Sequence, residues 1–139
     1  MSKISGRKMV GFVGTGRMGR RMAHHVINAG FPVQVFDIVS AAMTELVAKG
    51  ACAAASAREV AETSDVVITV LPDPAAVESV MLGEAGIASG IRPGAVVVEM
   101  STIAPTLSRR LGLAIERQGA HYLDCPISGG VPGAEQGTL

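Results

Sequence analysis

The chain has 139 residues, with twelve basic and twelve acidic side chains, so its formal net charge is zero. This balance, without a basic run, excludes the charge pattern of a nucleic-acid-binding protein. With 48% apolar and 17% charged residues, the composition is typical of a packed globular domain. No apolar run approaches membrane-spanning length, and Cys52 and Cys125 have neither metal-ligand spacing nor a disulfide framework. We expect one domain over residues 8–139, a disordered tail over residues 1–7 and a cytoplasmic location.

The first predicted elements surround a glycine pattern. An apolar run over residues 9–13 predicts a strand, and it ends at Gly14, Gly16 and Gly19, which have the spacing G-x-G-x-x-G. An amphipathic helix pattern follows at once and ends at Gly30. In a dinucleotide-binding fold, the first glycine makes a tight turn, the second lets the backbone approach a pyrophosphate, and the third allows helix–strand packing. The opening amides of the helix would then face the phosphates.

An acidic residue follows the next predicted strand, Val33–Phe36. It is Asp37, 18 residues after Gly19. A carboxylate there can accept hydrogen bonds from the adenosine ribose hydroxyls, and it repels a 2′-phosphate. Residues 38–40 include no Arg or Lys that would pair a phosphate. We therefore expect NAD to be preferred over NADP, while the alternative is that Asp37 is a turn or helix-cap residue.

Strand and helix patterns alternate through the rest of the chain. Helices are predicted over about 41–49, 56–64, 74–82 and 105–119; the second begins at a capping box formed by Ser56 and Glu59, the third at Pro74 with Asp73 as its cap, and the fourth at Pro105. Strands are predicted near 51–53, 66–70, 95–99 and 121–123. The β-branched run over 66–70 indicates a strand covered on both faces. No helix or strand is predicted in residues 124–139, which are rich in Gly, Pro and Ser. This alternation predicts an α/β fold, a doubly wound parallel sheet of six strands (Rossmann fold).

The candidate binding residues all follow strands. Ligands of doubly wound sheets bind beyond the carboxyl ends of the strands, where the strand order reverses. The glycine loop, Asp37, residues 71–72, residues 101–102 and residues 124–130 all lie at those predicted ends. The adjacent His24 and His25 fall on the predicted solvent face of their helix, so we expect no metal site.

Four segments, in order, resemble one family. They are GFVGTGRMG, DVVITVLPD, VEMSTIAP and YLDCPISGGVPGAEQGTL, and they extend from about Val10 to Leu139. The chain resembles the β-hydroxyacid dehydrogenases, which include 3-hydroxyisobutyrate dehydrogenase and tartronate semialdehyde reductase and are related to 6-phosphogluconate dehydrogenase. The resemblance implies an N-terminal NAD-binding domain of an oxidoreductase.

The resemblance also implies roles for individual residues. The cofactor site would comprise Gly14, Thr15, Gly16, Arg17, Met18 and Gly19 at the pyrophosphate, Asp37 at the adenosine ribose, Leu71 and Pro72 along the groove, and Thr102 near the nicotinamide. The family's substrate element would correspond to Ser128, Gly129 and Gly130, where a hydroxyl and exposed amides can bind a carboxylate. A flexible surface loop is the alternative interpretation of these three residues.

The implied reaction is hydride transfer between NAD and a small 3-hydroxy acid of the 3-hydroxyisobutyrate or 2-hydroxy-3-oxopropionate type. The family's general acid is a lysine well after the SGG motif, which would lie beyond Leu139. The lysines of this chain are Lys3, Lys8 and Lys49, so no residue of the chain is assigned as catalytic. The family's C-terminal helical domain is also absent from this sequence. We therefore expect the isolated chain to bind NAD without turnover.

Two alternatives remain. One is a stand-alone NAD-binding or regulatory module without catalysis, and the other is a fragment of a sugar-acid dehydrogenase of the 6-phosphogluconate type. Since a surface that faces a helical domain would be apolar, we also expect a homo-oligomer. The expected partner is a small-molecule hydroxy acid, with no role for nucleic acid, membrane or metal.

Overall fold

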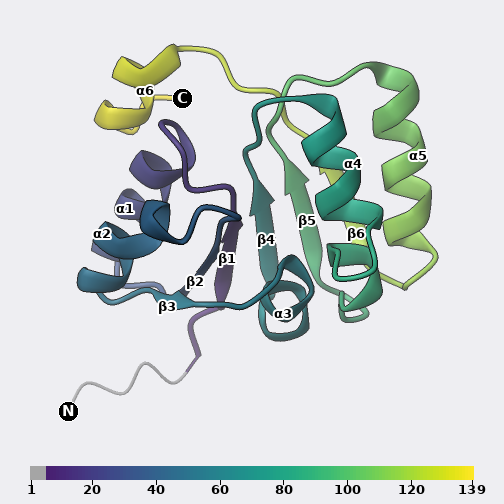
Figure 1. Cartoon of the computed structure of the whole chain (residues 1–139), viewed down its shortest axis with the longest axis horizontal. Coiled ribbons are helices and arrows are strands. Elements are labelled where there is room, and N and C mark those ends of the chain that lie inside the picture. The colour runs from purple at the N-terminus through teal and green to yellow at the C-terminus, as the bar shows by residue number, and fades with distance from the viewer. Residues whose placement is uncertain (1–5) are drawn as a thin grey trace.

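In the computed structural model, residues 6–139 are described, and they form a parallel sheet with helices on both faces (Figure 1). The strand order is β3-β2-β1-β4-β5-β6, and all five pairings are parallel. The strands are β1 (Val10–Val13), β2 (Val33–Phe36), β3 (Cys52–Ala53), β4 (Val66–Thr69), β5 (Val96–Glu99) and β6 (His121–Asp124). The order reverses between β1 and β4, which confirms the predicted doubly wound sheet.

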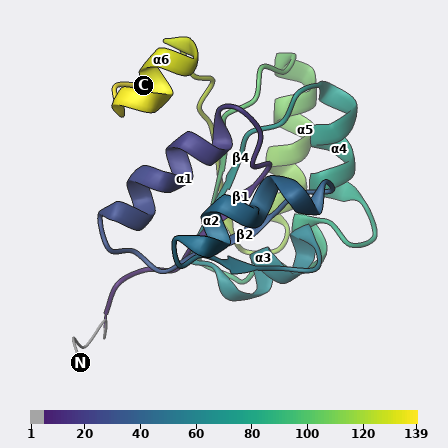
Figure 2. The same ribbon diagram turned by 60° about the vertical axis from the view of Figure 1, so that its left-hand side comes forward.

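Two apolar cores hold the helices to the sheet. The helices are α1 (Gly19–Asn28), α2 (Thr44–Ala48), α3 (Ala57–Thr63), α4 (Pro74–Leu82), α5 (Pro105–Glu116) and α6 (Gly130–Gln136). One core joins α1 and α2 to β1 and β2, and it includes the fully buried Leu46. The other core joins α3, α4 and α5 to the opposite face. Figure 2, in which α1 and α2 come forward, shows α4 and α5 on the far side of the sheet.

Helices cover the sheet unevenly. Among the described residues, the core beneath α1 and α2 extends no further than Ile68 of β4. The strand register places Val98 and Leu123 on this same face, where Leu123 is 50% exposed. The expectation that residues 66–70 are covered on both faces is therefore wrong, because Val66 and Ile68 are only partly buried. An apolar strip along β4, β5 and β6 is left without a helix.

The helix starts agree with the sequence, with two differences. Asp73 caps α4 by accepting a hydrogen bond from the Ala76 amide at 2.8 Å, as predicted. Ser56 accepts from the Glu59 amide at 3.1 Å, but the Glu59 carboxylate accepts from the Ala55 amide and not from that of Ser56. The helix predicted over 41–49 begins as a separate 3-10 turn, η1 (Ser40–Met43), ahead of α2.

Helix α6 is not predicted by the sequence patterns. It lies near the amino end of α1, apart from the helices of the other face (Figure 1). The His25 Nε2 atom is 3.0 Å from the Ala134 carbonyl and 2.9 Å from that of Glu135, so the imidazole donates to the last turn of α6. His24 bridges Glu45 and Lys49 with its two ring nitrogens. His25 is exposed and His24 is partly buried, so both lie on the outward side of α1 as predicted, and each also contacts a neighbouring helix.

The prediction of a disordered tail over residues 1–7 falls largely on residues 1–5, which lie outside the described residues. Arg7 donates a hydrogen bond to the Ala29 carbonyl, and its guanidinium lies 5.3 Å from the centroid of the Phe31 ring. These contacts attach Arg7 to the turn that follows α1.

Candidate functional site

The three glycines of the loop between β1 and α1 differ in their surroundings. Gly14 has a φ of +93°, and a Cβ there would lie 2.2 Å from the Val70 carbonyl oxygen. A Cβ on Gly19 would lie 2.0 Å from the Gly14 carbonyl oxygen. A Cβ on Gly16 would meet no atom within 4 Å. Gly14 and Gly19 are therefore required by the loop itself, whereas Gly16 leaves open space for a bound group.

The start of α1 suits an anion. Its first hydrogen bonds run from the Arg20 amide to Gly16 and from the Met22 amide to Met18, both at 3.1 Å. No side chain in the described part of the chain caps this helix end, and no acidic residue lies in its first turn. The opening amides and the positive end of the helix dipole thus remain available to a phosphate.

Asp37 lies at the end of β2 and is fixed by three hydrogen bonds. Its Oδ2 atom accepts from the Thr15 amide at 2.8 Å and from the Thr15 hydroxyl at 3.2 Å. Its Oδ1 atom accepts from the Val39 amide at 2.9 Å. The carboxylate therefore ties the glycine loop to the end of β2, and it performs part of the turn role that the alternative interpretation gave it.

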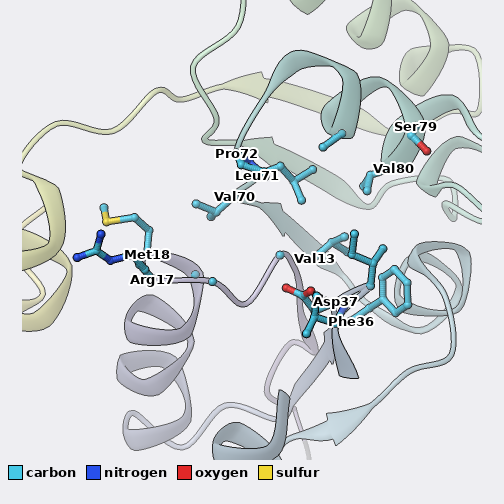
Figure 3. A pocket seen from close by; sticks show the side chains of 16 residues that line it. Val13, Arg17, Met18, Phe36, Asp37, Val70, Leu71, Pro72, Ser79 and Val80 are labelled. Carbon is cyan, nitrogen blue, oxygen red and sulfur yellow. Dashed lines mark hydrogen bonds between the residues drawn. The ribbon is translucent and has the colours of Figure 1, made fainter. Parts of the chain in front are cut away.

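A cavity of about 520 Å³ lies over this loop (Figure 3). One side consists of the glycine loop and the end of β2, and the other consists of the segment after β4 with the first turns of α4. Among the titratable side chains of the described residues, Arg17 and Asp37 line it. The predicted cofactor residues that it brings together are Gly14, Gly16, Arg17, Met18, Gly19, Asp37, Leu71 and Pro72.

A family model described as the NAD binding domain of 6-phosphogluconate dehydrogenase matches residues 9–139. The match includes the loop, the acidic residue and every strand described above. The chain belongs to this family, that of the β-hydroxyacid and 6-phosphogluconate dehydrogenases.

Individual relatives agree with this family. The NAD-dependent L-serine dehydrogenase of Pseudomonas aeruginosa is 46% identical over 132 residues, which are 95% of this chain and 44% of the relative. The solved 3-hydroxyisobutyrate dehydrogenase of Salmonella typhimurium has a TM-score of 0.86 and 36% identity over 94% of this chain and 45% of its own. Another solved structure, a complex with NADP+, has a TM-score of 0.86 and 32% identity over 92% of this chain and 45% of its own. The chain thus spans less than half the length of these relatives.

The cavity fits a nicotinamide dinucleotide. An open glycine at an uncapped helix start matches a pyrophosphate, and the Asp37 carboxylate, which lines the same cavity at the end of β2, matches a ribose. Gly16, Arg17 and Met18 would hold the pyrophosphate, and Asp37 would hold the adenosine ribose. Bound there, the dinucleotide supplies a hydride acceptor or donor, while this domain supplies the orientation.

Other predicted site residues lie outside the cavity lining. Thr15 is only 2% exposed, and it donates hydrogen bonds to Asp37 from its amide and its hydroxyl. Thr102 is exposed in the loop between β5 and α5. Residues 128–130 are exposed at the start of α6, where Gly129 and Gly130 have φ of +127° and +60°. Their predicted contacts with cofactor and substrate remain predictions.

The cavity also contains residues that sequence reasoning did not single out. Ile38 and Val39 follow Asp37 and are 88% and 58% exposed, so they form an apolar rim. Opposite them, the α4 side chains of Ser79 and Val80 line the wall. Two adjacent exposed apolar residues at a strand end are the signal that points to this rim, because such residues suit the face of an adenine ring.

Proposed function

We propose that the chain is the NAD-specific nucleotide-binding domain of a dehydrogenase that acts on a small 3-hydroxy acid. The observation that carries this proposal is the carboxylate of Asp37 on the cavity wall. An ionised carboxylate has about four acceptor positions. Thr15 and Val39 occupy three of them, which leaves one position on Oδ1 for a ribose hydroxyl.

The same carboxylate disfavours NADP. A 2′-phosphate would place two like charges within contact distance, and this repulsion is offset only when a cation pairs the phosphate. Residues 38–40 offer none. Arg17 lines the cavity on the side of the loop away from Asp37, at the start of α1 (Figure 3). The charges around the cavity therefore support the unphosphorylated ribose.

The substrate assignment rests on the family and on the location of residues 128–130. These residues follow β6, so they lie at the same sheet edge as the ends of β4 and β5. The Ser128 hydroxyl and the exposed amides of Gly129 and Gly130 offer hydrogen-bond donors to a carboxylate. The 3-hydroxy acids share a carboxylate that is separated by one carbon from the carbon bearing the alcohol.

Titration calorimetry with NAD+ and NADP+ tests the cofactor preference. We expect the wild-type chain to bind NAD+ at least about tenfold more tightly, and Asp37→Asn to narrow that ratio, because a neutral amide still accepts one hydrogen bond but no longer repels phosphate. Asp65→Asn is the matched control, since Asp65 also accepts from a backbone amide at 2.8 Å, that of Met9, at the opposite edge of the sheet. Equal or tighter binding of NADP+ by the wild-type chain would contradict the proposal.

A second candidate function is nucleotide binding without turnover. The observation in its favour is the position of the described lysines: Lys8 lies beside the amino end of β4, and Lys49 pairs with His24 and Glu45. Within residues 6–139, no lysine therefore lines the cavity to act as a general acid. An assay of NADH formation with L-serine and 3-hydroxyisobutyrate tests whether this chain turns over by itself, and we expect no turnover. Measurable turnover would show that a residue of this chain supplies the acid.

A further inference from the structure

A buried carboxyl group lies at the end of β5, outside the cavity. Glu99 is fully buried, and its register partner in β4 is Thr69. Its Oε1 atom accepts from the Ser101 amide, and its Oε2 atom accepts from the Thr69 hydroxyl, both at 2.6 Å. Acidic side chains are seldom fully buried unless they are paired. The short distances and double acceptance indicate that the loop after β5 is built on this carboxyl group.

The hydrogen bonds continue from Glu99 to the cavity. Ser101 is 5% exposed, and its hydroxyl accepts from the Leu71 amide at 2.9 Å. On the other side, the preceding Val70 amide donates to Val13 of β1 at 3.1 Å. The segment after β4 is thus held between β1 and the β5 loop, across the point where the strand order reverses.

Leu71 connects this network to the glycine loop between β1 and α1. A Cβ built on Gly14 would lie 3.0 Å from the Leu71 Cδ2 atom, so the Leu71 side chain packs directly on the tight turn. Leu71 also lines the cavity wall opposite the glycine loop (Figure 3). Because Asp37 follows β2 and Leu71 follows β4, they belong to the two halves of the sheet that bind the two nucleotides of a dinucleotide.

We propose that Glu99 is a positioning residue for the nicotinamide half of the cofactor. Through Ser101 it fixes Leu71 against the glycine loop, and it does so without touching the dinucleotide. This inference rests on the nucleotide binding proposed above. It predicts that removing a hydrogen bond of the network weakens binding of the whole dinucleotide. Binding of the adenosine half alone, which Asp37 and the rim of Ile38 and Val39 hold, should be unaffected.

The test compares two ligands. Ser101→Ala removes the acceptor of the Leu71 amide, and Glu99→Leu removes the acceptor of the Ser101 amide. We expect each variant to bind NADH about tenfold more weakly, as for loss of one hydrogen bond to a partly buried donor, while AMP affinity changes less than about twofold. Since the chain contains no Trp, NADH fluorescence can be followed without tryptophan background. Ser108→Ala is the matched control, because Ser108 is a buried serine on α5 whose hydroxyl bonds Tyr122.

The double variant tests whether Glu99 acts through Ser101. If it does, Glu99→Leu combined with Ser101→Ala weakens NADH binding about tenfold, as each change does alone, and not by the roughly hundredfold of two independent effects. An additive loss, an equal loss of NADH and AMP affinity, or unchanged NADH affinity would each overturn the proposal. Glu99→Gln, which keeps one acceptor oxygen, is expected to retain most of the affinity.

Amide hydrogen exchange on the wild-type chain needs no variant. The Leu71 amide lies outside any strand, yet we expect it to exchange as slowly as the amides of β4 because Ser101 holds it. Rapid exchange at Leu71 would overturn the inference even if every variant failed to fold. If the wild-type chain binds no NADH at all, the proposed function fails, and the exchange result still decides whether the network fixes Leu71.

Discussion

Gly16→Ala should separate cofactor binding from folding. Gly16 is exposed, and a methyl group there would meet no protein atom within 4 Å. Its φ is not in the left-handed region, so alanine introduces no backbone strain. We therefore expect the free energy of unfolding to stay the same or rise by roughly 0.4–1 kcal/mol, because alanine restricts the unfolded chain.

The same methyl group should greatly weaken binding. It occupies the space through which the backbone approaches the pyrophosphate, and a shifted phosphate loses hydrogen bonds from the opening amides of α1. A hydrogen bond to a charged group contributes about 1.5–3 kcal/mol, so loss of one corresponds to a roughly ten- to hundredfold weaker affinity. Titration calorimetry with NAD+ measures this change.

Gly14→Ala is the contrasting variant. Its φ of +93° and the 2.2 Å approach to the Val70 carbonyl mean that both the residue and a neighbouring strand end must shift. The left-handed conformation alone costs roughly 1–2 kcal/mol, and the backbone contact adds to this. We expect the melting temperature to fall by about 6 °C or more for a loss of at least about 2 kcal/mol. If Gly16→Ala bound NAD+ as tightly as wild type, or melted as early as Gly14→Ala, the assignment of roles within the loop would be wrong.

Three further predictions address other parts of the fold. Burial raises the pKa of the half-buried Tyr122 above 10.0, and this effect exceeds the lowering by its hydrogen bond with Ser108, so the free energy of unfolding should decline as the pH rises through 10 and beyond. Ultraviolet titration of this single tyrosine should give a midpoint above 10 in the native chain that returns to 10 in denaturant. A native midpoint at or below 10 would refute the prediction. Asp73→Ala removes the cap of α4 and should cost about 1 kcal/mol, or roughly 3–4 °C in thermal melts, with an unchanged melting temperature as the contrary result. Because the apolar strip on β4, β5 and β6 is exposed, light scattering should detect dimers or larger assemblies of the wild-type chain at high concentration. Leu123→Lys adds charge to this strip and should reduce the association. A wild-type monomer would contradict the expected self-association.

Several functional features were predictable because they depend on short stretches of sequence. Gly14 and Gly19 are recognisable because the tight turn and the helix start that require them lie within a few residues of each other in the sequence. Asp37 is recognisable because it ends an apolar run at the expected distance from the glycines. Its hydrogen bonds with Thr15 were not predictable, since they join the ends of two strands that are adjacent only in the folded sheet.

Helix α6 and Glu99 show why the remaining features were missed. The segment GVPGAEQ has three residues that disfavour helix, two Gly and one Pro, and its helix is supported by the contact with His25, 109 residues away in the chain. Glu99 interrupts an apolar strand pattern, and nothing nearby in sequence indicates burial. Its partner Thr69 lies 30 residues earlier and meets it only through strand pairing.

In the described part of the chain, no helix has the length and apolar character needed to cross a membrane. Likewise, the described residues contain no cluster of three or more His, Cys, Asp or Glu side chains arranged to hold a metal ion. Both findings concern residues 6–139.

The sequence by itself determined the alternation of strands and helices, the turn at the glycines and the acidic residue after β2, because each depends on periodicity or on conformational limits of single residues. Tertiary structure alone decided which strand ends meet. It brought Glu99, Ser101 and Leu71 into one network and left a strip of β4, β5 and β6 without a helix. The physical reason is that strand order and helix placement arise from burial summed over the whole sheet, which no local pattern records.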